Sequence, residues 1–281
     1  MILQTLLDAV FSRAELLPMR VAWLTDLHLS FVPRAERMAF YGSVRAEEPD
    51  AILLGGDTGE APNLLEFLDE IDRNLQVPVY FVLGNHDFYG GSIARVRDLV
   101  ARKTAGSRLH WLPATGIVHL GDETALIGHD SWADGRLGDF FRSNVRLNDY
   151  LHIEELTNLP KLTCYSTLNA LGDEAADYLE ARAREALAAR RDVVVLTHVP
   201  PFREACWHEG QISNADYLPH FSCKAVGDRL LDVMRGYPER SMTVLCGHTH
   251  SSGTAKLLDN LTVYTGGAEY GAPRHQAILT F

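Results

Sequence analysis

The sequence predicts an α/β fold, and two patterns carry that prediction. Short apolar runs rich in β-branched residues recur along the chain and end in glycine or polar residues, as buried strands do. In the first part of the chain these runs alternate with helical patterns, which indicates β–α–β units, whereas the C-terminal part shows only strands and turns. No repeat or linker divides the 281 residues, so we expect one domain over residues 1–281.

The expected elements follow in order along the chain. Strands are predicted at Val21–Thr25, Ala51–Leu54, Val79–Leu83, Thr124–Ile127, Val193–Thr197, Thr243–Cys246, Leu261–Thr265 and Gln276–Phe281. Helices are predicted at Arg34–Glu48, Asn63–Asn74, Ser92–Lys103, Gly172–Arg191 and Lys224–Arg235. Two irregular segments, 130–167 and 199–223, are expected to be long functional or mobile loops, the first with a short helix near Asp149–Leu156.

Residues 1–18 are a candidate N-terminal extension, either an amphipathic lead-in helix or the product of an upstream start. They carry charges and lack the long apolar run of a signal peptide, and no 18-residue apolar stretch is present to span a membrane. Four cysteines are too sparse for a disulfide framework and suit a reducing compartment. We therefore expect a cytoplasmic protein that does not act at a membrane.

The charge balance disfavours some partners. Lys and Arg number 26 against 37 Asp and Glu, for a net charge of −11. An acidic protein is not drawn to duplex nucleic acid or anionic lipid, so both are unexpected partners. A small anionic substrate stays compatible with this charge, because carboxylates around a metal add to the acidic count while the bound ion reverses the local field.

Five polar clusters lie directly after predicted strands. They are Asp26-Leu27-His28, Gly55-Gly56-Asp57, Gly84-Asn85-His86-Asp87, Thr197-His198 and Gly247-His248-Thr249-His250. Ligands of open α/β sheets collect at the carboxyl ends of the strands, so we expect these clusters to converge on one site. Their glycines allow the backbone to turn tightly as each strand ends.

The residue types in these clusters indicate a metal site. Carboxylate, imidazole and amide oxygen together suit a borderline divalent ion such as Mn, Fe or Zn. A carboxylate that bridges two ions holds them about 3.5–4 Å apart, the separation used for displacement at phosphorus. The chain has no Gly-x-Ser-x-Gly motif and no cysteine in an activating motif, so a covalent nucleophile is not predicted.

In this order, the clusters resemble the signature of the calcineurin-like metallophosphoesterases. The resemblance runs from Val21 to about Gly267 and fills every metal-binding position of the family. It implies a four-layer α/β/β/α sandwich of two mixed sheets flanked by helices. It also implies two metal sites: Asp26, His28 and His250 at one ion, Asn85, His198 and His248 at the other, and Asp57 as the bridge.

By the same resemblance, His86 is not a ligand but stands near the phosphate, where an imidazole is suited to stabilising the transition state or protonating the leaving oxygen. The implied nucleophile is a hydroxide that bridges the two ions. One motif departs from the Ser/Thr protein phosphatases of the superfamily, which continue Gly-Asp into Asp-Arg-Gly. Here the chain reads Gly56-Asp57-Thr58-Gly59-Glu60, which favours the diverse, largely bacterial esterase branch.

Other residues have two interpretations each. Asp87 either orients a neighbouring group or caps the helix that starts near Gly91. Candidate substrate contacts are Asn85, Arg203 and His129, with Arg136 and Arg274 more typical of a solvated surface. Cys206, His208, His220 and Cys223 are either a structural zinc site or, as we expect, scattered loop residues. The aromatic residues Trp132, Phe140, Phe141, Trp207 and Tyr217 either form a substrate wall or, as we expect, pack the loops.

The expected function is metal-dependent hydrolysis of a phosphomonoester or phosphodiester of a small phosphorylated substrate, nucleotides among them. Two alternatives differ in class: a scaffold that keeps the fold but has lost catalysis, and a DNA nuclease. A scaffold usually lacks a ligand or the acid, whereas this chain has all of them. A nuclease requires a basic face and further domains, and neither is evident in the sequence.

Overall fold

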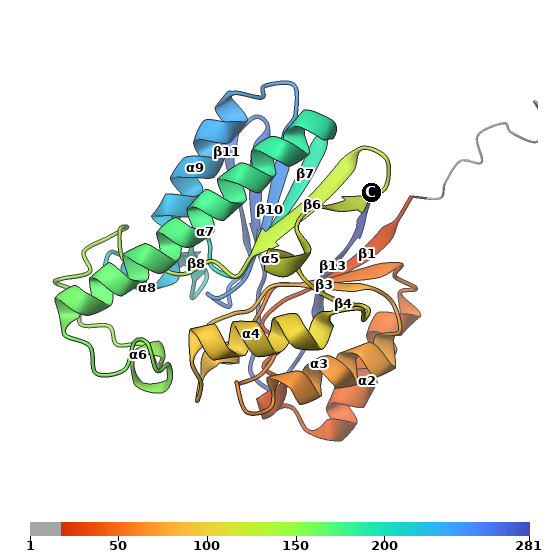
Figure 1. Ribbon diagram of the computed structural model, residues 1–281, viewed down its shortest axis with the longest axis horizontal. Helices are drawn as coiled ribbons and strands as arrows, with labels where there is room; N and C mark the ends of the chain where they lie inside the picture. Colours follow the sequence, from red (N-terminus) through yellow and green to blue (C-terminus); the bar gives the residue numbers. More distant parts are fainter. Residues whose placement is uncertain (1–17) are drawn as a thin grey trace, which may run out of the picture.

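The computed structural model describes residues 18–281 and shows two sheets packed face to face, with helices on both outer faces (Figure 1). The first sheet runs in the order β13 (His275–Thr280), β1 (Arg20–Leu24), β2 (Ala51–Leu54), β3 (Val79–Phe81) and β4 (Leu109–Trp111). The second runs in the order β11 (Gly253–Leu258), β12 (Leu261–Thr265), β10 (Ser241–Cys246), β7 (Asp192–Thr197), β6 (Thr124–His129) and β5 (Val118–Leu120).

Both sheets are mixed. Strands β1 to β4 are parallel and β13 pairs with β1 in the antiparallel sense. In the second sheet β6, β7, β10 and β12 are parallel, and antiparallel β5 and β11 form the two edges. The predicted four-layer sandwich of two mixed sheets flanked by helices is therefore confirmed.

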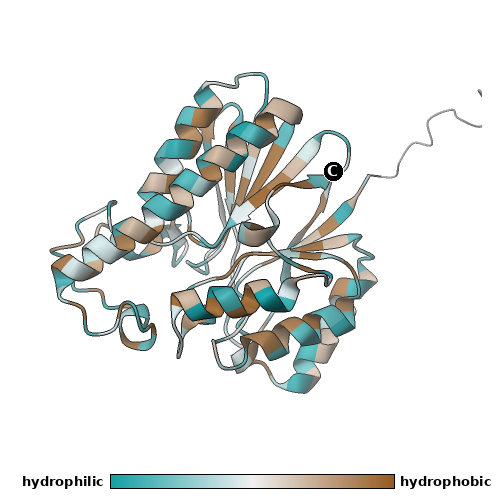
Figure 2. Ribbon diagram, in the orientation of Figure 1, coloured by the Kyte–Doolittle hydropathy of each residue, from teal (hydrophilic) through white to brown (hydrophobic). Residues whose placement is uncertain are grey.

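Helices cover each sheet on one side only. The first sheet is covered by α2 (Arg34–Ala46), α3 (Leu64–Leu75) and α4 (Ile93–Thr104), and the second by α7 (Lys161–Ala189) and α9 (Lys224–Arg235). Apolar residues of these helices face the sheets and polar residues face outward (Figure 2). In α3, for example, Leu64, Phe67, Leu68 and Ile71 recur at helical spacing and are all buried.

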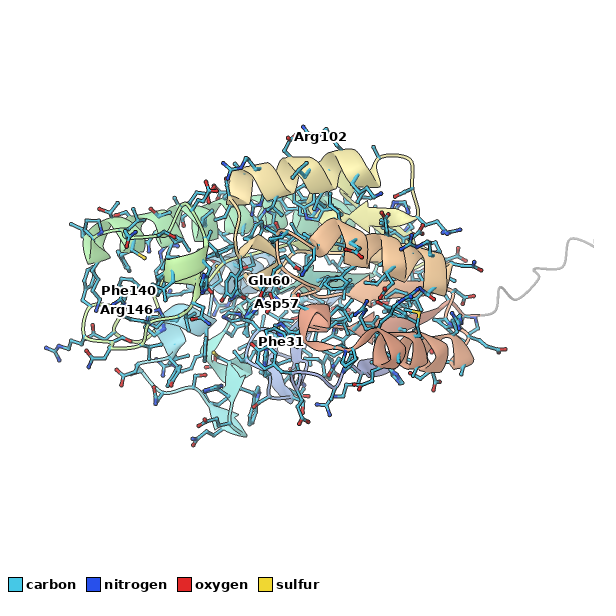
Figure 3. The ribbon with its side chains drawn as sticks, turned by 90° about the horizontal axis from the view of Figure 1, so that it is seen from below. Phe31, Asp57, Glu60, Arg102, Phe140 and Arg146 are labelled. Carbon is cyan, nitrogen blue, oxygen red and sulfur yellow. The ribbon has the colours of Figure 1, made fainter. Side chains whose placement is uncertain are left out.

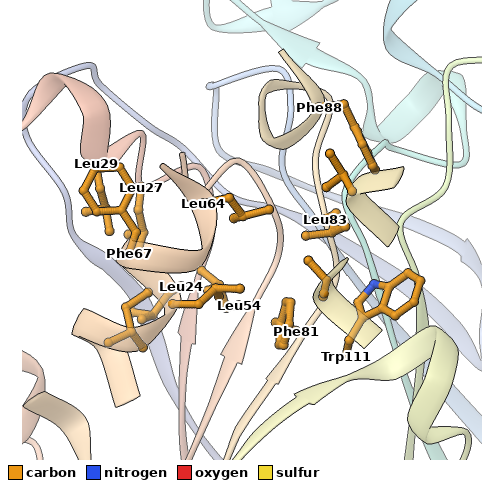
Figure 4. Close-up of a cluster of buried hydrophobic side chains, with 14 of the residues drawn as sticks. Leu24, Leu27, Leu29, Leu54, Leu64, Phe67, Phe81, Leu83, Phe88 and Trp111 are labelled. Carbon is orange, nitrogen blue, oxygen red and sulfur yellow. The ribbon is translucent and has the colours of Figure 1, made fainter. Parts of the chain in front are cut away.

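Alternation along the strands divides the apolar side chains between two layers. Leu24 and Leu54 point into the core beneath α3, which Figure 4 shows together with Phe67 and Phe81. Their strand neighbours belong to the central core between the sheets, where residues of β1 and β2 meet residues of β7 and β10: Val21, Trp23, Leu53, Val194, Leu196 and Leu245. Parallel strands buried on both faces explain the continuous apolar runs in the sequence.

One helix begins earlier than the sequence indicates. We expected a loop over 130–167 and a helix from Gly172, but α7 already starts at Lys161 and runs for 29 residues. Gly172 lies inside this helix, where a Cβ atom would come within 2.6 Å of the Cβ of Asp134. The glycine therefore allows close packing rather than marking a helix start.

Short elements occupy the connecting segments. They are η1 (Leu29–Phe31), η2 (His86–Phe88), α5 (Leu112–Thr115), α6 (Asp149–His152), η3 (Arg203–Ala205), β8 (Trp207–His208), β9 (Gln211–Ile212) and α8 (Leu218–Phe221). The helix expected near Asp149–Leu156 is thus only four residues long, and segment 199–223 holds a hairpin of β8 and β9. Of the candidate extension, residues 1–17 lie outside the described part of the chain. Within residues 18–281, no helix is long and apolar enough to cross a membrane.

Candidate metal centre

The strand-end clusters meet at one edge of the two sheets. Asp26, His28, Asp57, His248 and His250 all adopt positive φ angles, between 44° and 70°. Such backbone is unfavourable for residues other than glycine and concentrates at functional sites. Backbone hydrogen bonds between the loops stabilise it: the amide of Asp26 donates to Gly56 O, and the amide of His28 donates to Asp57 O.

A first cluster consists of Asp26, His28, Asp57 and His250. One possible ligand atom from each of these side chains lies within 4.8 Å of the others. The Nε2 atom of His28 is 3.0 Å from Nε2 of His250 and 3.6 Å from Oδ2 of Asp57. Nε2 of His250 is 3.6 Å from Oδ1 of Asp26. Two carboxylates and two imidazoles that converge in this way fit a divalent cation.

A second cluster lies on the other side of Asp57. Oδ1 of Asn85 is 3.0 Å from Nε2 of His198 and 3.0 Å from Nδ1 of His248. Oδ1 of Asp57 is 3.4 Å from Nε2 of His198, whereas its Oδ2 faces His28. The carboxylate of Asp57 therefore presents one oxygen to each cluster, as a bridge between two ions requires.

Backbone carbonyls fix the orientation of two of these imidazoles. Nδ1 of His198 lies 2.9 Å from Gly55 O, and Nε2 of His248 lies 3.2 Å from the carbonyl of His220. Because a carbonyl accepts, these nitrogens carry the protons. The opposite nitrogens, Nε2 of His198 and Nδ1 of His248, face the second cluster and would offer lone pairs to an ion there, as metal-binding histidines commonly do.

The electrostatics of the centre are those of a cation site. Burial lowers the pKa of His28 and of His248 to about 3, so both are neutral. Burial also acts to lower the pKa of His198, but the carboxylate of Asp57 outweighs it and raises that pKa overall. The same pairing keeps the pKa of Asp57 low despite its burial. A divalent ion held by these residues would supply the positive charge that a proton on His198 otherwise supplies, so its binding would release that proton.

His86 lies beside the clusters and lines a cavity of about 240 Å³ over them. Its backbone amide donates to Oδ1 of Asp57 over 2.9 Å. The ring stacks on Tyr89, with centroids 4.2 Å apart, and meets the ring of His28 at 4.6 Å. Its Nδ1 atom is buried without a hydrogen-bond partner among the described residues, so the imidazole is held by packing rather than by another polar side chain.

Comparison with known proteins decides the family. A model of the calcineurin-like phosphoesterase family matches residues 19–252, which include every residue of the two clusters. The chain belongs to this family. No curated protein matches it.

Several solved structures share the fold of this family member. Phosphopantetheinyl hydrolase from Mycobacterium tuberculosis superposes with a TM-score of 0.60 at 16% identity, covering 92% of this chain and 95% of that one. A dimetal phosphatase from Danio rerio gives 0.56 at 14% identity, covering 89% and 87%. The protein TT1561 of Thermus thermophilus gives 0.52 at 13% identity, covering 89% of each chain. At such low sequence identities, the similarity to these proteins shows a shared fold and nothing further.

Asp87 connects the loops that carry the two clusters. Its Oδ1 atom accepts the backbone amides of Thr58 and Gly59, and its Oδ2 accepts the amide of Gly84. The side chain thereby ties the loop after β2 to the loop after β3. Helix α4 is instead capped by Ser92, whose hydroxyl accepts the amide of Arg95. Of the two interpretations of Asp87, the orienting one is confirmed.

Two predicted substrate contacts lie away from the cavity. Arg203 is exposed on η3, and His129 is buried, where its Nδ1 atom accepts the amide of Ser131. Neither lines the cavity over the clusters, and Asn85 alone of the three candidates does. Arg136 is engaged with Asp134 and Asp173.

The zinc site and the aromatic substrate wall, which the sequence left open, are both replaced by packing contacts in the structure. Within residues 18–281, Cys206, His208, His220 and Cys223 do not bring their possible ligand atoms together, so the zinc site is not formed. Cys206 instead lies 3.3 Å from the hydroxyl of Ser213, and the ring of His220 contacts Tyr150. Trp132 packs on Phe88, and the other aromatics also contact neighbouring elements: Phe140 and Phe141 meet Tyr165 of α7, Tyr217 meets Phe221 of α8, and Trp207 lies against Gly253 of β11.

The sequence analysis missed several residues of the site, and Asp149 and Tyr270 are the two with the clearest roles. Asp149, at the start of α6, accepts a hydrogen bond from Nδ2 of Asn85 over 2.8 Å and from the hydroxyl of Tyr89 over 2.6 Å. This fixes the amide of Asn85 so that its Oδ1 faces the two imidazoles of the second cluster. Tyr270, in the loop after β12, lines the cavity on the side of the first cluster. Neither residue belongs to a motif.

A second cavity, of about 350 Å³, lies behind the segment that carries Asp149. Arg146 and Tyr150 of this segment line it, and Lys161 and His220 contribute from α7 and α8. In Figure 3, Arg146 and Phe140 lie toward one end of the molecule, away from Asp57. The larger cavity is therefore not the one that contains the candidate metal ligands.

Proposed function

We propose that the protein is a metal-dependent hydrolase of phosphate esters whose centre holds two divalent ions, Mn, Fe or Zn. The observation that carries the proposal is Asp57, whose two carboxylate oxygens face two separate ligand clusters. Asp26, His28 and His250 would hold one ion, and Asn85, His198 and His248 the other. The ligand set is complete and the imidazole of His86 lies beside it, which disfavours a scaffold that has lost catalysis.

The chemistry that bound ions supply at such a centre is an activated water and neutralisation of charge on the phosphoryl oxygens. The protein provides the geometry around it. Asp57 holds both clusters in register, and Asp149 orients Asn85. His86 faces the cavity from η2 and donates a proton to the ester oxygen as the bond to phosphorus breaks.

The proposed metal-dependent hydrolysis is tested by measuring turnover after the metal is removed and again after it is restored. The protein is stripped, reloaded with Mn²⁺ and assayed with bis(p-nitrophenyl) phosphate and p-nitrophenyl phosphate. We expect no turnover in the stripped form and turnover after reloading. Absence of turnover with both esters, in protein that carries two ions, would contradict the proposal.

The role of His86 is tested with leaving groups of different basicity. His86→Ala is expected to lower kcat by about 10²–10⁴. The loss is expected to be larger for a phenyl ester than for the p-nitrophenyl ester, because phenolate is the stronger base and depends more on protonation. His119→Ala is the matched control, since His119 is exposed on β5 and does not line the cavity. An equal loss for both esters would show that His86 acts in another way.

A further inference from the structure

Two aromatic side chains are exposed at the mouth of the metal centre. Phe31 is 51% exposed and Tyr270 is 49% exposed, and their ring centroids lie 5.0 Å apart. The first belongs to η1, directly after the site residue His28, and the second to the loop that follows β12. Single exposed aromatics are ordinary. Two that contact each other beside a catalytic centre form a surface, which we call the aromatic platform.

The aromatic platform is continuous with the first cluster. The ring of Tyr270 lies 4.5 Å from the ring of His28 and 5.2 Å from that of His250, and it lines the cavity. It is 6.2 Å from the ring of His86. A group attached to a phosphorus atom at this centre can therefore lie against Tyr270 while the ester bond stays beside His86.

The opposite part of the cavity also carries apolar side chains. Phe221 lies beside the second cluster, with its ring 5.3 Å from that of His248, and the ring of His208 is 5.0 Å from Phe221. Leu147 completes this side. The cavity thus offers an apolar or aromatic surface beside each of the two clusters, which matches an ester with an organic group on both sides of phosphorus.

The charges in the cavity point the same way. Among the described residues, none of those lining it is Lys or Arg, whereas Asp57 and Asp149 are both present. A phosphomonoester is a dianion, and proteins usually pair such groups with guanidinium or ammonium donors. A phosphodiester carries a single negative charge and needs less compensation beyond the ions themselves.

We propose that the substrate is a phosphodiester in which a planar group, such as a nucleobase or an aryl ring, stacks on the Tyr270–Phe31 platform. The inference rests on the proposed hydrolysis at the two-ion centre and specifies its substrate class. Aromatic rings stack face-offset or edge-to-face at centroid separations of about 4.5–7 Å, and an exposed ring pair offers both geometries. The proposal predicts that phosphomonoesters are poor substrates.

The test compares planar and non-planar diesters of similar size. Diphenyl phosphate and dicyclohexyl phosphate are titrated by calorimetry into the Mn²⁺-loaded wild-type protein, Tyr270→Ala, Tyr270→Phe and Phe31→Ala. We expect the wild type to bind the planar diester about two- to tenfold more tightly, Tyr270→Phe to keep this preference, and the two alanine variants to reduce it. Tyr264→Ala is the control, because Tyr264 is 41% exposed on β12 and does not line the cavity.

A kinetic comparison separates this inference from the proposed function. We expect kcat/KM of bis(p-nitrophenyl) phosphate to exceed that of p-nitrophenyl phosphate at least tenfold. Turnover that prefers the monoester, or equal binding of the planar and non-planar diesters by the wild type, overturns the substrate class while hydrolysis itself stands. Absence of turnover with both esters overturns the proposed hydrolysis instead, and the calorimetric comparison still reports on the aromatic platform.

Discussion

The two cavities on either side of the Arg146–Tyr150 segment differ in chemistry. The cavity over the metal centre contains carboxylates and imidazoles, and none of its described lining residues is Lys or Arg. The cavity behind the segment is larger, contains Arg146 and Lys161, and has no carboxylate among its described lining residues. Metal chemistry requires electron-pair donors, so the smaller cavity is the catalytic candidate. Size alone would select the other one.

The difference follows from how each cavity is built. The metal cavity is lined by residues at the ends of β2, β3 and β10, where backbone hydrogen bonds between loops hold even left-handed residues in place. The larger cavity is lined by loop residues, by the short helices α6 and α8, and by the first turn of the long helix α7. There Lys161 donates to the carbonyls of Phe141 and Ser143 and lies over the ring of Phe140. Its charge thereby stabilises a loop, and the comparison predicts that it has no part in turnover.

The largest effect is expected from Asp57, which both clusters share. Asp57→Asn should lower turnover by roughly a thousandfold or more, because it weakens the binding of both ions. Bound ions lower the activation barrier by several kcal/mol when they stabilise charge in the transition state. Bound metal per chain, measured by elemental analysis, should fall below two. A variant that keeps both ions and wild-type turnover would remove Asp57 from the bridging position.

A smaller effect is expected from Asp149, which touches no ion. Asp149→Ala leaves the amide of Asn85 free to rotate, and loss of such an orienting partner typically costs 10–100-fold in metal affinity or activity. Asp149→Asn keeps an oxygen acceptor and should recover part of the loss. Titration with Mn²⁺ should show the change at one of the two sites, since Asn85 belongs to the second cluster only. An equal loss at both sites, or no rescue by Asn, would indicate a general structural role.

The sequence predicted most of the helices and polar clusters around the metal cavity, because residues that directly follow parallel strands meet at one edge of the sheet. Helices α2, α3, α4 and α9 begin within one residue of their predicted starts, and the polar clusters meet where the parallel strands end. The edge strands β5 and β11 and the short strand β4 were not predicted. They are short or contain exposed residues, so no continuous apolar run marks them.

The remaining site residues depend on contacts that no local pattern encodes. Asp149 reaches Asn85 across 64 positions, from a segment without periodic signal. Tyr270 lies in a turn-rich loop whose position is set by pairing of β13 with β1 at the far edge of the first sheet. Such residues enter a site through tertiary packing, so their roles emerge only when the sheets are in place.

The smallest effect is expected in the larger cavity. Lys161→Met removes two hydrogen bonds to carbonyls and should lower the free energy of unfolding by about 1 kcal/mol, since the ammonium group is exposed and partly compensated by water. Urea unfolding measures this loss. The kcat and KM of the Mn²⁺-loaded enzyme should stay within twofold of wild type, and Arg146→Gln should change neither stability nor turnover appreciably. A tenfold fall in kcat/KM for either variant would mean that the larger, cationic cavity takes part in the reaction. The claim that only the smaller cavity does so would then be wrong.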